Sequence, residues 1–85
     1  MRERQIEQRL TQAVRQRQGL CPKWVSPGLD GVPDRIILLP GGRIAFAELK
    51  APGKPLRPLQ ALGFRVYVID NQEQIGGVLD ALSAT

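Results

Sequence analysis

The sequence contains no histidine and a single cysteine, Cys21, among its 85 residues. The absence of histidine excludes Ser–His–Asp and Cys–His catalysis and every metal site with a histidine ligand. One cysteine cannot form an internal disulfide or a thiolate cage, and this usage favours an intracellular protein. No apolar run approaches the roughly 20 residues that span a bilayer, and the charged N-terminus is unlike a signal peptide. We therefore expect no membrane partner and a cytoplasmic location, with any catalysis resting on carboxylates, lysine, tyrosine or serine and a hard metal ion.

Aromatic residues are few, at 5%, whereas twelve Lys and Arg against eight Asp and Glu give a net charge of +4. This basic balance favours a polyanionic partner. A chain of this length buries only roughly 60–65% of the surface that its unfolded form exposes. We therefore expect one small domain, residues 1–85, whose modest core makes dimerisation an expectation.

Hydrophobic periodicity predicts an α/β domain. Apolar residues at helical spacing predict an N-terminal helix over residues 3–18 that stops at Gly19, and residues 73–82 predict a short C-terminal helix. Strands are expected at residues 21–26, 33–39, 43–50 and 64–70, in a mixed sheet of about four strands. Three prolines within residues 51–58 leave room for one helical turn at most before the last strand.

The most informative feature is the Pro-Gly-Gly segment at residues 40–42, which is typical of a three-residue hairpin turn. In that register Asp34 faces Glu48 across the two strands. Directly opposed residues lie on one face with Cβ atoms roughly 4.5–5.5 Å apart. Lys50 shares this face because side chains alternate along a strand. A turn one residue longer or shorter would put the two acids on opposite faces.

Opposed carboxylates repel each other, so this arrangement calls for a compensating cation. Lys50 would supply part of it and a divalent metal more. Mg²⁺ suits the site because it prefers carboxylate, carbonyl and water oxygens. A metal-bound water would act as the nucleophile on a phosphoryl group, with Lys50 orienting it or stabilising charge. The alternative is an ordinary solvated strand face, and the apolar residues that share this face favour the metal site.

A longer pattern resembles a known family. Gly-Val-Pro-Asp at residues 31–34, Glu-Leu-Lys at 48–50 and Gln60 after a proline-rich loop resemble the VRR-NUC branch of the PD-(D/E)xK nuclease superfamily. The likeness covers nearly the whole chain and implies a restriction-endonuclease-like core. It implies Mg²⁺ or Mn²⁺ bound by Asp34, Glu48, the backbone carbonyl of Leu49, and either Glu3 or Glu7. Lys50 would then be the catalytic lysine, and Gln60 would lie near the site.

The resemblance also implies a function. It indicates a metal-dependent, structure-selective DNA endonuclease that acts as a homodimer on branched DNA such as four-way (Holliday) junctions. The basic residues expected to contact DNA phosphates are Lys23, Lys54, Arg57 and Arg65. Trp24 and Tyr67 are expected in the core or an interface, and the alternative is that they stack on an unpaired base. The family's crossover helix is shortened or missing in this chain, so the alternative is an impaired nuclease-fold module that binds branched DNA without cleaving it.

Overall fold

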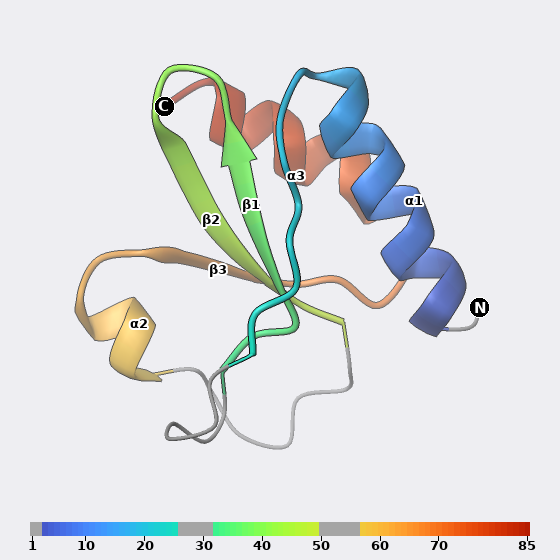
Figure 1. Cartoon of the computed structure of the whole chain (residues 1–85). Helices are drawn as coiled ribbons and strands as arrows, with labels where there is room; N and C mark the ends of the chain where they lie inside the picture. The colour runs from blue at the N-terminus through green and yellow to red at the C-terminus, as the bar shows by residue number, and fades with distance from the viewer. Residues whose placement is uncertain (1–2, 26–31, 50–56) are drawn as a thin grey trace.

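The computed structural model describes residues 3–25, 32–49 and 57–85. Helix α1 (Glu3–Gln16) is followed by the hairpin strands β1 (Arg35–Leu39) and β2 (Arg43–Glu48). The short helix α2 (Arg57–Ala61), strand β3 (Arg65–Val68) and helix α3 (Gln74–Ser83) complete the described elements. The predicted α/β class, with a helix near each end and a mixed sheet between them, is confirmed (Figure 1).

The sheet has the order β1-β2-β3, with β1 antiparallel and β3 parallel to the central strand β2. Leu39 pairs with Arg43 and Ile36 with Phe46, so the predicted hairpin register is confirmed. The turn requires glycine, because Gly41 and Gly42 adopt φ angles of +87° and +75°, where other residues are strained.

The strand expected at residues 21–26 is not a regular strand where the structure describes it. This segment runs beside β1 and pairs with it through two isolated bridges, Leu20 with Leu38 and Lys23 with Arg35. Pro22 explains the interruption: its carbonyl accepts a hydrogen bond from the Ile36 N–H at 3.0 Å, but it has no N–H to donate in return. The described sheet therefore has three strands instead of about four.

The core lies between the sheet and two helices, α1 and α3, which pack against each other (Figure 1). Alternate residues of β1 and β2 point into it, and the buried side chains include Ile37, Ala45 and Ala47 from the sheet. The helices contribute Ile6, Leu10, Val14, Ile75, Leu79 and Leu82. Cys21 is buried beside them, and burial raises the pKa of its thiol, so this cysteine is a neutral core residue at physiological pH.

The opposite face of the sheet is apolar but less covered. The ring of Phe46 lies 5.1 Å from that of Trp24 and 5.6 Å from that of Phe64, between centroids. Ile44, Phe64 and Val68 are nevertheless 37–41% exposed. Trp24 thus packs in an apolar cluster, as expected, and Tyr67 packs at the margin of the main core.

The connection between β2 and β3 is short, as predicted. Its described part holds a single helix of five residues, α2, which contacts β3. None of the described helices is both long and apolar enough to cross a membrane, and α1, at 14 residues, is the longest of them.

Candidate functional site

Asp34 and Glu48 lie where β1 begins and β2 ends. The β1–β2 register runs to the pair Arg35 and Ala47, so residues 34 and 48 are the next positions along the two strands. The carboxylate of Asp34 turns toward β2, and its Oδ2 accepts a hydrogen bond from the Leu49 N–H at 2.8 Å. On the other side of β2, the Glu48 carbonyl accepts a hydrogen bond from the Ile69 N–H at 2.9 Å. The Asp34 carboxylate is thereby fixed against the Glu48–Leu49 peptide.

A shallow depression of about 340 Å³ opens beside Asp34, and we call it the acid depression. Acidic side chains reach it from two elements, Glu3 and Glu7 from α1 and Asp34 from the start of β1. Its other lining residues are Lys23, Trp24, Val25, Val32 and Pro33. Three carboxylates around one ammonium group give this hollow an excess of negative charge, which attracts cations.

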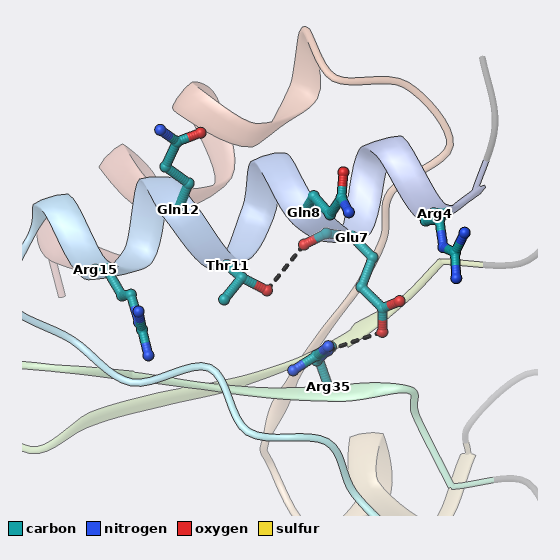
Figure 2. A pocket seen from close by; sticks show the side chains of 7 residues that line it. All are labelled: Arg4, Glu7, Gln8, Thr11, Gln12, Arg15 and Arg35. Carbon is teal, nitrogen blue, oxygen red and sulfur yellow. Dashed lines mark hydrogen bonds and ion pairs between the residues drawn. The ribbon is translucent and has the colours of Figure 1, made fainter.

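Glu7 is held by an ion pair that the sequence analysis did not foresee. Its Oε2 lies 2.9 Å from the Arg35 Nε (Figure 2). The Arg35 Nη1 also donates to the Cys21 carbonyl at 2.7 Å. The Arg35 and Glu7 side chains are only 15% and 25% exposed. Strand alternation predicts that Arg35 and Asp34 point to opposite faces of the sheet. It does not predict that α1 places the Glu7 carboxylate beside Arg35. Glu3, by contrast, is exposed and forms no ion pair with the described residues.

The donor chemistry fits a hard divalent cation. Carboxylate oxygens of Asp34 and Glu48 and the carbonyl of Leu49 are the kind of ligand that Mg²⁺ and Mn²⁺ prefer. The Leu49 side chain is buried, and the main-chain N–H of Leu49 contacts Asp34. Within the described ranges, no three acidic or thiol side chains are close enough together to form a metal-binding group. Lys50 and Lys54 lie outside the described residues.

The remaining expected residues are more dispersed. Lys23 is exposed and lines the acid depression. Gln60 is exposed on α2, which begins at Arg57. Arg65 is also exposed, but its Nη1 donates to the Tyr67 hydroxyl at 3.2 Å and to the Ala81 carbonyl at 3.5 Å. Arg65 therefore contacts the last turn of α3.

Two comparisons with known proteins found similar proteins, one by sequence and one by structure. No family model matches the chain. A protein of Acyrthosiphon pisum secondary endosymbiont phage 1, named "Putative nuclease p44", is 43% identical over 91 residues, which cover 98% of this chain and 97% of that protein. A solved structure described as a VRR_NUC domain is 25% identical and has a TM-score of 0.79, covering 92% of this chain and 94% of its own.

The mixed sheet, the helices beside it and these relatives define the class as an α/β protein with a nuclease fold. More specifically, the chain belongs to the VRR-NUC family. The resemblance inferred from residues 31–34 and 48–50 is thereby confirmed.

Proposed function

We propose that this protein is a Mg²⁺- or Mn²⁺-dependent endonuclease that hydrolyses phosphodiester bonds in branched DNA. The observation that carries the proposal is the hydrogen bond from the Leu49 N–H to Asp34, made at the strand ends where Glu48 also lies. A carboxylate fixed by the backbone needs no reorganisation when a cation arrives, which favours a preformed metal site. The nuclease relatives support the same reading.

In this proposal Asp34, Glu48 and the Leu49 carbonyl hold the cation, with Glu3 or Glu7 completing the set. A divalent cation there would polarise a phosphoryl oxygen and lower the pKa of a bound water. Lys50 follows Glu48 by two residues and would stabilise the negative charge that develops on the phosphate. Lys23, on the rim of the acid depression, would offset the repulsion between the acids and the DNA backbone.

Branched DNA and a homodimer belong together in the proposal. A two-fold dimer presents two equivalent sites, which matches the symmetry of a four-way junction. The second sheet face supports dimer formation, since Ile44, Phe64 and Val68 leave apolar surface exposed there. No described residue suggests the reading of a base edge, so DNA shape would determine the substrate.

The test compares a labelled four-way junction with a linear duplex of the same sequences, in Mg²⁺, Mn²⁺ or EDTA. We expect the junction to be cut preferentially, only with metal. We expect Lys50→Ala to lose about 10²–10³-fold in rate, as when a group that stabilises transition-state charge is removed. Arg9→Ala, an exposed change on α1, is the matched control and should cut normally.

Two results would overturn the proposal. Undiminished cleavage by Lys50→Ala would show that Lys50 takes no part in catalysis. Junction binding by the wild-type protein without products in either metal would favour the alternative, a nuclease-fold module that binds without cleaving. The five-residue α2 is the feature that gives this alternative its weight.

A further inference from the structure

A second hollow runs along α1. It has a volume of about 420 Å³ and lies where α1 faces β1. Every residue that lines it is polar or charged: Arg4, Glu7, Gln8, Thr11, Gln12, Arg15 and Arg35 (Figure 2). We call it the Arg4–Arg15 groove. Each of these side chains ends in a polar or charged group that a polar ligand could contact, while the methylene stems of the long side chains form much of the floor.

The groove carries an excess of positive charge. Three guanidinium groups line it against one carboxylate, that of Glu7. That carboxylate is already paired with Arg35 at 2.9 Å. Arg4 and Arg15 lie along α1 on either side of this pair, both are exposed, and neither takes part in an ion pair between described residues (Figure 2). Two uncompensated guanidinium groups thus face the same hollow.

The spacing of these arginines suits an extended polyanion. Arg4 and Arg15 are eleven positions apart along the α-helix, a rise of about 16.5 Å, and one DNA strand advances about 3.4 Å per nucleotide. The groove therefore spans about five nucleotides. Gln8 and Gln12 lie between the arginines along α1 and also line the groove.

The groove also leads to the candidate site. Glu7 lines both the Arg4–Arg15 groove and the acid depression, so the two hollows meet at this residue. Arg9 in the helix and Arg17 just after it differ from Arg4 and Arg15, because each lies near an acidic side chain. Arg9 shares its hollow with the acidic Glu73, and Arg17 pairs with Asp80 at 2.8 Å. The structure therefore distinguishes Arg4 and Arg15 from Arg9 and Arg17.

We propose that the Arg4–Arg15 groove binds the phosphate backbone of one DNA arm and guides it to the acid depression. This inference rests on the proposed function for its ligand, but it assigns a contact surface on α1 that is separate from the metal-binding acids. Binding here is independent of base sequence and should be strongly salt-dependent.

The test is DNA binding without catalysis, measured by fluorescence anisotropy of a labelled junction in EDTA between 50 and 300 mM salt. For Arg4→Gln/Arg15→Gln we expect weaker binding at low salt and a slope of log K against log salt reduced by about 0.9 per arginine. Arg9→Gln, which removes the same charge from the same helix, should keep the wild-type affinity and slope. Thermal unfolding should be unchanged in all of them, because these side chains are exposed.

Wild-type affinity and slope in the double variant would overturn the inference, as would an equal loss in Arg9→Gln. These outcomes are separate from those of the cleavage assay. A protein that cuts junctions normally without Arg4 and Arg15 would disprove the groove alone. A protein that binds through them but never cuts would disprove the nuclease.

Discussion

Arg35 links three parts of the molecule through one side chain. Its guanidinium joins β1 to Glu7 of α1 at 2.9 Å and to the Cys21 carbonyl at 2.7 Å. The Arg35 and Glu7 side chains are both largely buried. An unpaired carboxylate or carbonyl in such surroundings lowers the free energy of unfolding. The Glu7–Arg35 pair also holds Glu7 where the acid depression meets the Arg4–Arg15 groove. Loss of this ion pair would therefore alter the candidate site.

We therefore expect Arg35→Ala to destabilise the fold by about 2–3 kcal/mol, because it breaks two charge-assisted contacts and leaves Glu7 unpaired. Chemical denaturation is the measurement. Arg35→Lys should recover only part of the loss, since a single ammonium does not reproduce the two directed donors. Arg9→Ala should change stability by less than about 0.5 kcal/mol, as an exposed position does. A similar value for Arg35→Ala would show that the pair is not structural.

At the scale of elements, the end of α1 differs from the prediction in an informative way. Gln18, and not Gly19, adopts the left-handed conformation, with φ of +62°. Gly19 donates to the Val14 carbonyl at 3.0 Å and Gln18 to the Arg15 carbonyl at 2.9 Å, the pattern of a Schellman motif. Gly19 is needed for another reason: a Cβ there would lie 2.3 Å from the Leu38 carbonyl oxygen.

These adjacent positions should respond oppositely to substitution. Gln18→Gly should stabilise the fold by about 0.5–1 kcal/mol by removing the left-handed strain. Gly19→Ala should destabilise it by about 2 kcal/mol or more, because the backbone of β1 must move. Thermal or urea unfolding of the two variants is the measurement. Stabilisation by Gly19→Ala, or destabilisation by Gln18→Gly, would contradict this account of the helix end.

Part of this fold could be predicted from the sequence and part could not. The hairpin register follows from Pro-Gly-Gly and strand alternation, which are local rules, and so does the limit that the prolines impose on α2. The irregular pairing at Pro22 and the left-handed Gln18 depend on neighbours that come together only in three dimensions. The Glu7–Arg35 pair joins residues 28 positions apart, and no local pattern predicts it.

At the scale of the whole molecule, coverage of the sheet is unequal. Helices α1 and α3 bury one face, while Ile44 and Phe64 remain 37% and 40% exposed on the other. We expect the wild-type protein to sediment as a dimer with twice the 9.4 kDa chain mass. Ile44→Glu should give the monomer, because a charge buried in an apolar interface is costly. Gln16→Glu, an exposed change on α1, should leave the dimer intact. A monomeric wild-type protein, or a dimeric Ile44→Glu, would contradict the expectation.

The central claim is that Asp34 and Glu48 share a divalent cation, and Mn²⁺ binding measured by electron paramagnetic resonance tests it most directly. Asp34→Asn is the informative variant, because an amide oxygen can still accept the Leu49 N–H while the charge is lost. The account predicts that Mn²⁺ affinity falls by about 100-fold or more, since even an outer partner of a metal ligand is worth about 10–100-fold. Equal Mn²⁺ affinity in the wild-type and Asp34→Asn proteins would contradict it.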